Sequence, residues 1–232
     1  RPLHRARRTR VAAGHGAAVA GLSPQAVWHD PWAAVGAGGW GYAVTDPHPG
    51  QSYDWAEAIV TVETLAEIAQ AAASGSQTVA GWMAADALRI AAWRPRGQTE
   101  ADGRALPHEA DWLRTAVHLD KGCYRGQETV ARVHNLGKPP RHLLLLHLDG
   151  SADERPTTGE DVTAGGRTVG RLGTVIDHYE FGPIALALIK RTIPADTELV
   201  AGPTAAAIDP DSVPSDDAPQ AGRIAVDRLR GR

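Results

Sequence analysis

Short apolar runs separated by turn signals recur through the second half of the chain. They are "RHLLLLHLDG" (141–150), "GRTVGRLGTVID" (166–177) and "GPIALALIKR" (182–191). Regularly spaced short strands with turns between them are typical of a small antiparallel barrel or sandwich. The pattern changes at "LGKPP" (136–140), so we predict a C-terminal β-barrel domain over residues 139–205.

The first half of the chain shows helical periodicity instead. "TVETLAEIAQAAASG" (61–75) repeats apolar residues at helical spacing, with Thr61 placed to cap the start and Gly75 to end the helix. "WMAADALRIAAW" (82–93) predicts a short helix that passes into a strand, and "GQETVARVHN" (126–135) predicts another helix. Since residues 21–60 read as loops around short strands, we expect an α+β domain over 21–138.

The two ends of the chain differ in charge. "RPLHRARRTR" (1–10) holds five arginines and no acid, which fits either a nucleic-acid-binding arm or a solvated terminus, so residues 1–20 stay unassigned. "IDPDSVPSDDAPQAG" (208–222) is acidic, rich in proline and without periodicity, which predicts a flexible tail over 206–232. The net charge of −3 gives no overall basic field, so we expect no direct contact with nucleic acid.

Composition narrows the class of protein. A hydrophobic fraction of 43% permits a proper core. The single cysteine cannot form an internal disulfide, which fits a reducing cytosol. No stretch approaches the roughly 18 apolar residues of a membrane span. We therefore expect a cytoplasmic monomer that does not contact membranes.

The only cysteine, Cys123, lies in "KGCYRGQETVARVHN" (121–135). The thiolate is the nucleophile and the soft metal ligand, and a nearby cation or a helix N-terminus lowers the pKa of a thiol. Lys121 and Arg125 are close in sequence, and a predicted helix follows. This setting favours a reactive thiol. The alternative is a buried structural cysteine, which is a common environment for a lone thiol.

No catalytic base for Cys123 can be assigned from sequence. His118 and His134 lie five residues before and eleven residues after it, but a Cys–His pair requires spatial contact. One cysteine with scattered histidines is also not a zinc cage of four ligands. A metal bound by Cys123 would need further ligands from a partner or a small molecule.

The loop "LPHEADW" (106–112) carries two acids, Glu109 and Asp111. An ionised carboxylate accepts two hydrogen bonds at once, so it suits a paired N–H edge such as that of a pterin. The alternative is a solvated loop acid.

"KGCYRGQE" (121–128) resembles the signature of the YgfZ family, folate-binding relatives of the aminomethyltransferase (T-protein) of the glycine cleavage system. The flanking segments "ALRIAAWRPR", "LPHEADWLRTAVHLD", "GRTVGRLGTV" and "GPIALALIKR" resemble the family in the same order. The resemblance implies an α+β folate-binding core with a ferredoxin-like subdomain, followed by a small antiparallel β-barrel. It also implies that relatives carry a long N-terminal segment, which forms part of the folate site and which this sequence lacks.

The resemblance also implies a function: tetrahydrofolate-dependent support of iron–sulfur enzymes, including cluster-dependent tRNA modification. The implied partners are folate and either iron–sulfur client enzymes or cluster-assembly proteins. In this scheme Cys123 is the reactive thiol and transient ligand of an iron–sulfur cluster, with Lys121 beside it. Tyr124 and Gln127 complete the motif as folate-binding candidates.

Two further folate contacts are implied by the family. Glu109 matches the acid that contacts the pterin in the wider family, and Arg89 matches the arginine of the "LR.EA" element. The glutamate that commonly follows this arginine by two residues is Ala91 here. Two other functions stay open at this point: an aminomethyltransferase proper, and a non-catalytic scaffold that senses folate. Whether the chain is an enzyme is therefore left open.

Overall fold

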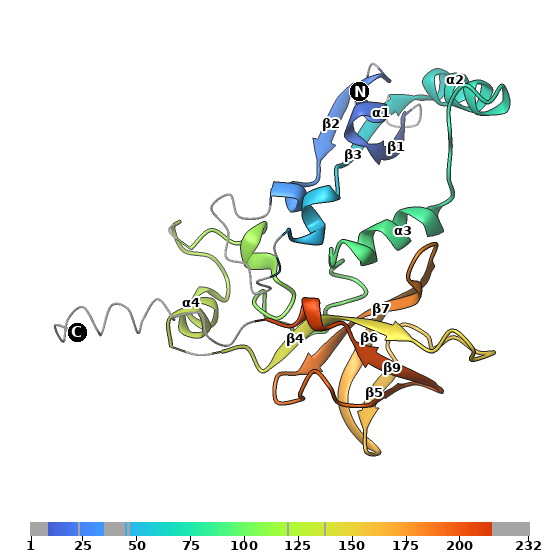
Figure 1. The fold of residues 1–232 in the computed structure, drawn as a ribbon. Helices are drawn as coiled ribbons and strands as arrows, with labels where there is room; N and C mark the ends of the chain where they lie inside the picture. The colour runs from blue at the N-terminus through green and yellow to red at the C-terminus, as the bar shows by residue number, and fades with distance from the viewer. Residues whose placement is uncertain are drawn as a thin grey trace.

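The computed structural model describes residues 9–22, 24–34, 45, 47–119, 121–136 and 138–214. Figure 1 shows a small sheet with helices α1 and α2 at one end and a β-barrel at the other, with α3 running between them. Helix α4 lies to one side of the barrel, next to the loops that precede it in the chain. The predicted mixed α+β fold with a C-terminal barrel is confirmed.

The sheet consists of β1 (Thr9–His15), β2 (Ala26–His29) and β3 (Trp55–Thr61), antiparallel in the order β1-β3-β2. Alternate residues of β3 are buried against α1 (Gly16–Ala20), and the cluster that they form consists of Val19, Ala56, Ala58 and Val60. Trp55, Glu57 and Ile59 lie on the opposite face, because side chains alternate along a strand. Two short 3-10 turns, η2 (Pro31–Ala34) and η3 (Pro49–Ser52), lie between β2 and β3.

The predicted helix after Thr61 is α2 (Val62–Ala73). The hydroxyl oxygen of Thr61 accepts a hydrogen bond from the backbone N–H of Thr64 at 3.2 Å, as an N-cap does. Gly75 lies just past the end with a φ of +74°, which glycine adopts without steric cost. Helix α4 (Gln127–Leu136) is confirmed as well. No helix among the described residues is long and apolar enough to span a membrane.

Helix α3 (Trp82–Ala91) is confirmed, but the strand expected directly after it is wrong. Trp93 adopts a left-handed backbone conformation with a φ of 55°. Its N–H donates to the carbonyl of Ile90 at 2.9 Å, which closes a turn instead of extending a strand. The apolar run continues past the helix because Ala92 is buried beside Trp32 and Tyr53.

The barrel contains six strands: β4 (Arg141–Leu148), β5 (Asp161–Ala164), β6 (Arg167–His178), β7 (Gly182–Lys190), β8 (Leu199–Ala201) and β9 (Thr204–Ile208). They close in the order β4-β7-β6-β5-β8-β9, with every neighbouring pair antiparallel. Three of these strands, β4, β6 and β7, were predicted from sequence. The short strands β5, β8 and β9 close the barrel between β6 and β4. Its interior is filled by aliphatic side chains such as Leu146, Leu172 and Ile189.

Helix α3 covers part of the outer face of the barrel. Ile90 packs on Leu145, Ile184 and Leu186, which point outward from β4 and β7. Strand β7 is therefore buried on both faces, and this explains why "PIALALI" is a continuous apolar run without polar alternation.

The structure shifts two predicted boundaries. Strand β9 ends at Ile208, three residues beyond the predicted barrel end at 205, and the 3-10 turn η5 (Pro210–Ser212) follows it. The N-terminal segment left unassigned over 1–20 contains β1 and α1. Residues 1–8 and 215–232, which include the arginine-rich end and most of the predicted tail, lie outside the described residues.

Candidate functional site

The loop before α4 is fixed to the barrel through Glu109. Its side chain is fully buried, and its two carboxylate oxygens accept hydrogen bonds from Nε and Nη2 of Arg141, each at 2.8 Å. The N–H of Leu106 adds a third at 2.9 Å. The alternative of a solvated loop acid is therefore wrong. Because protein donors hold both oxygens, Glu109 does not present its carboxylate to a ligand in this arrangement.

Arg141 holds a second acid, Asp102, on its other side, with Nη1 2.6 Å from Oδ2. These hydrogen bonds lower the pKa of Asp102 to about 2. Contacts with Glu109 and Asp102 also raise the pKa of Arg141 above its usual value. The two ion pairs of Arg141 join the polar loop to the first strand of the barrel.

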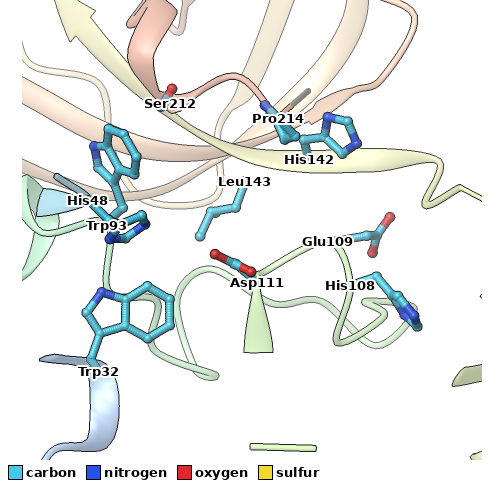
Figure 2. A pocket seen from close by; sticks show the side chains of 10 residues that line it. All are labelled: Trp32, His48, Trp93, His108, Glu109, Asp111, His142, Leu143, Ser212 and Pro214. Atoms are coloured by element: carbon cyan, nitrogen blue, oxygen red, sulfur yellow. The ribbon is translucent and has the colours of Figure 1, made fainter. Parts of the chain in front are cut away.

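A small cavity lies beside this loop (Figure 2). Its lining comes from η2, the residue before η3, the turn after α3, the loop 108–111, β4, and η5 with the residues that follow it. The lining residues are Trp32, His48, Trp93, His108, Glu109, Asp111, His142, Leu143, Ser212 and Pro214. Figure 2 shows the carboxylate of Asp111 pointing toward Trp32 and Leu143, whereas that of Glu109 points away from them. The cavity holds about 30 Å³, far below the volume of a typical small-molecule pocket. It suits a water-sized molecule.

Backbone strain is concentrated at this cavity. Among the described residues, the non-glycine residues with positive φ are Trp93 and Asp111, both at 55°, and both line it. Strained residues persist only where surrounding contacts fix them. Asp111 is held by Arg114, whose Nη2 and Nε lie 2.6 and 2.7 Å from Oδ2. The guanidinium of Arg114 in turn lies 5.6 Å from the ring of Trp32.

Two buried histidines of this cavity are neutral at physiological pH. Burial, and secondarily the charge of Arg114, lowers the pKa of His48 to about 4. Burial, and secondarily His134, lowers the pKa of His108 to about 4. Nδ1 of His48 accepts a hydrogen bond from the N–H of Gly50 at 3.0 Å, so its proton is on Nε2. Within the described chain no group accepts from Nε2, which leaves a donor for a small polar molecule.

Arg89, the second predicted folate contact, is a buried cross-link between α3 and the barrel. Its Nε binds Asp86 at 3.0 Å, Nη1 binds Glu100 at 3.2 Å, and Nη2 donates to the hydroxyl of Thr174 at 2.8 Å. Glu100 also accepts from the N–H and hydroxyl of Thr174, at 2.9 and 2.6 Å. Protein groups therefore use most of the donors of Arg89.

Cys123 is exposed, so the alternative of a buried structural cysteine is wrong. The ammonium of Lys121 lies 5.0 Å from the ring centre of Tyr124, a cation–π contact across the thiol-bearing turn. Gly126, with a φ of +85°, turns the chain into α4, where Gln127 is the first residue. The role of these residues stays a prediction, and none of them lines a cavity described here.

Of the two histidines near Cys123 in sequence, His134 contacts the loop that carries Glu109. His134 lies on α4, with its ring centre 6.5 Å from that of His108, so the helix packs against the loop 106–111. No group of three or more His, Cys, Asp or Glu side chains that could hold a metal ion occurs in the described part of the chain.

A wider cavity of about 240 Å³, which sequence reasoning missed, lies between the sheet and the barrel along α3. Ala91, where the family commonly has glutamate, is on its wall, together with Trp55, Asp54 and the β6–β7 turn that carries Glu180. In the sequence, the departure from the family pattern at Ala91 was the one feature that fell on this cavity. The structure thus brings Glu109, Arg89 and Ala91 to three different cavities.

The sequence of the chain was compared with those of known proteins. No family model matches the chain. It is 35% identical over 89 residues to the tRNA-modifying protein YgfZ of Aliivibrio fischeri ES114, covering 35% of this chain and 26% of that protein. It is 34% identical over 110 residues to YgfZ of Yersinia enterocolitica, covering 47% and 30%. The matches therefore span less than a third of the length of these relatives.

Among solved structures, the glycine cleavage system aminomethyltransferase T from Bartonella henselae aligns with a TM-score of 0.53 at 18% identity. The alignment covers 73% of this chain and 47% of that protein. At this identity the likeness concerns the fold alone. Together, the relatives and the shared fold confirm the predicted resemblance: the chain is similar to YgfZ-type proteins and has the aminomethyltransferase fold.

Proposed function

We propose that the chain acts in a YgfZ-type accessory protein that binds tetrahydrofolate and supports iron–sulfur enzymes, including enzymes that modify tRNA. The observation that carries the proposal is the exposed thiol of Cys123, one turn ahead of α4 within "KGCYRGQE". The names of the sequence relatives support the link to tRNA modification.

The thiol suits transfer or transient binding of iron and sulfur better than proton transfer. Thiolates are soft ligands that bind iron, whereas carboxylates prefer harder ions and protons. The described residues offer no ready-made metal cage, so a cluster would take its other ligands from a client or assembly protein. An exposed position allows such a partner to approach Cys123 directly.

Tetrahydrofolate requires a slot for a flat ring edged with N–H donors. Glu109 does not fit this role here, because Arg141 and Leu106 hold its carboxylate. The cavity at Ala91 fits better: it offers the indole of Trp55 as an apolar surface, and Asp54 and Glu180 as acceptors. We therefore assign the folate to this cavity rather than to Glu109.

The test is complementation of a strain that lacks its own YgfZ-type factor, with the natural protein and its Cys123→Ser and Cys123→Ala variants. We expect both variants to accumulate and fold as the parent does but to leave tRNA thiomethylation unrestored. An exposed arginine variant on the barrel, Arg167→Gln, is the matched control and should restore it.

Two outcomes would contradict this proposal. Full restoration by Cys123→Ser would make the thiol dispensable and favour a folate-sensing scaffold. Folate-dependent release of ammonia from an aminomethyl-lipoyl carrier by the purified protein would favour an aminomethyltransferase, the activity named for the structural neighbour.

A further inference from the structure

A second cleft lies between the open face of the sheet and the N-terminal half of α3, and it shares Tyr53 and Trp55 with the 240 Å³ cavity. The inference drawn from it does not rest on the proposed function. Four aromatic residues and five charged residues share its walls, and we call it the tryptophan cleft. The aromatic residues are Trp28, Tyr53, Trp55 and Trp82, and the charged residues are Asp30, Glu57, Arg89, Arg94 and Arg96. It has a volume of about 120 Å³. Three of the seven tryptophans of the chain thus meet around one carboxylate.

The pairing of the strands explains how these residues meet. Trp28 of β2 lies directly opposite Glu57 of β3, so the two side chains share a face of the sheet. Trp55 lies two residues before Glu57 on the same face, and Trp82 begins α3 across the cleft. Trp28 and Trp82 remain 47% and 62% exposed. Large aromatic side chains left open on a rim are typical of a recognition site.

Each of the three arginines on the wall is paired with an acid of the protein, which leaves Glu57 without a cation. Asp30 pairs with Arg94 at 3.0 Å, and Asp86 pairs with Arg96 at 2.6 Å. Arg89 lies between Asp86 and Glu100, as described above. The carboxylate of Glu57 forms no ion pair or hydrogen bond with any described residue, although Glu57 is half-buried on the wall of the cleft. A carboxylate held among indole rings without a cation of its own favours a positively charged ligand.

We propose that the tryptophan cleft binds a trimethylammonium group, carried by a small molecule or by a methylated lysine side chain. Indole rings attract such cations through their negative faces, and the methyl groups gain apolar contact that a hydrated ammonium does not. The guanidinium of Arg96, 5.0 Å from the ring centre of Trp82, already makes a contact of this kind at the rim. Glu57 supplies the opposite charge.

The size and the stacking of the rings favour this ligand over a flat base. A cavity of about 150 Å³ holds benzene, so 120 Å³ suits a trimethylammonium head, which has fewer heavy atoms. Tyr53 is stacked on Trp55 with ring centres 5.9 Å apart and an angle of 5° between the planes. One face of Trp55 is therefore covered, and a nucleobase would not be sandwiched there.

The test is titration of the purified chain with choline, tetramethylammonium and a trimethyllysine peptide. Binding is measured by NMR as broadening of the N-methyl proton signal of each ligand. The neutral isostere 3,3-dimethylbutanol and guanosine monophosphate are the comparison ligands. We expect the cations to bind and the isostere to bind at least tenfold more weakly, since it lacks the charge. Preference for choline or for the peptide distinguishes a small molecule from a methylated protein.

Variants locate the site. Glu57→Gln and Trp28→Leu should each weaken choline binding by roughly tenfold. The matched controls, Glu67→Gln on the exposed surface of α2 and Trp112→Leu outside the cleft, should leave it unchanged. Thermal melting of each variant verifies that it folds. Equal binding of choline and the isostere, binding of guanosine monophosphate alone, or unchanged affinity in both cleft variants would overturn the proposal.

Discussion

Arg141 binds Glu109 through two parallel hydrogen bonds, from Nε to Oε1 and from Nη2 to Oε2, each 2.8 Å long. Two-point pairing of this kind fixes the planes of both groups relative to each other. The backbone adds a further link, because the N–H of Leu143 donates to the carbonyl of Glu109 at 2.7 Å. The acid of the "LPHEADW" loop therefore anchors that loop to β4.

Replacement of Arg141 by methionine should destabilise the protein by about 3–5 kcal/mol, because it leaves the buried charge of Glu109 uncompensated. Urea unfolding followed by circular dichroism measures this change. The matched control is Arg155→Met. Arg155 pairs with Asp177 at 3.2 Å on the open surface, where an ion pair contributes about 0–1 kcal/mol. An equal loss of unfolding free energy in the two variants would show that Arg141 does not compensate a buried Glu109 charge, and Glu109 would again be a candidate for ligand binding.

The helices and strands that depend on a local pattern of capping and apolar residues could be predicted from the sequence. The Thr61 cap and the short apolar run in "RHLLLLHL" are local signals, and both helix α2 and strand β4 followed. Strands β5, β8 and β9 were not assigned because runs of three to five residues carry little periodicity. Their pairing depends on closure of the barrel, which is a property of the whole domain.

Gly173→Ala should destabilise the barrel by about 1–3 kcal/mol, the usual cost of overpacking. A Cβ at this position would lie 2.8 Å from the Glu100 side chain and 2.9 Å from the carbonyl oxygen of Leu186. The added methyl would displace Glu100 from Thr174 and Arg89. Gly103→Ala is the control, because nothing lies within 4 Å of a Cβ there. Thermal unfolding that is identical for both variants would contradict the close approach of Glu100 to β6.

Stability should fall as the pH drops from about 6.5 to about 4. Burial lowers the pKa values of His48 and His108 to about 4 in the folded chain, from the ordinary value of 6.5. In this window the unfolded chain binds protons that the folded chain does not, so acid favours unfolding. Above pH 6.5 both states are neutral at these positions and the effect is absent.

His48→Asn tests this dependence, since an amide oxygen can still accept from Gly50 but does not titrate. We expect the loss of unfolding free energy between pH 7 and pH 5 to shrink by roughly 1–2 kcal/mol relative to the parent. His29→Asn, at an exposed strand position, should leave the pH dependence unchanged. A parent-like slope in His48→Asn would show that His48 is protonated in the folded protein.

The site was harder to predict than the fold, because residue type does not reveal what a side chain contacts. Glu109 and Arg89 were predicted to bind folate, but their carboxylate and guanidinium bind Arg141, Glu100 and Thr174. Those partners lie 32, 11 and 85 residues away in sequence. The charged neighbours of Cys123 in sequence are consistent with an exposed thiol. Sequence alone could not exclude a buried thiol, whereas the structure does.

Ala91→Glu should strengthen tetrahydrofolate binding by roughly tenfold, the effect of one charge-assisted hydrogen bond. Ala91 lies on the wall of the 240 Å³ cavity, where the carboxylate common in the family would face the bound ring. Isothermal titration of the parent and the variant measures the change, and Ala73→Glu at the exposed end of α2 is the control for added charge. Thermal melting shows separately whether the new carboxylate disturbs α3. If Ala91→Glu folds normally but binds tetrahydrofolate no better than Ala73→Glu, the folate does not occupy this cavity, whereas a gain confined to Ala91→Glu assigns it there.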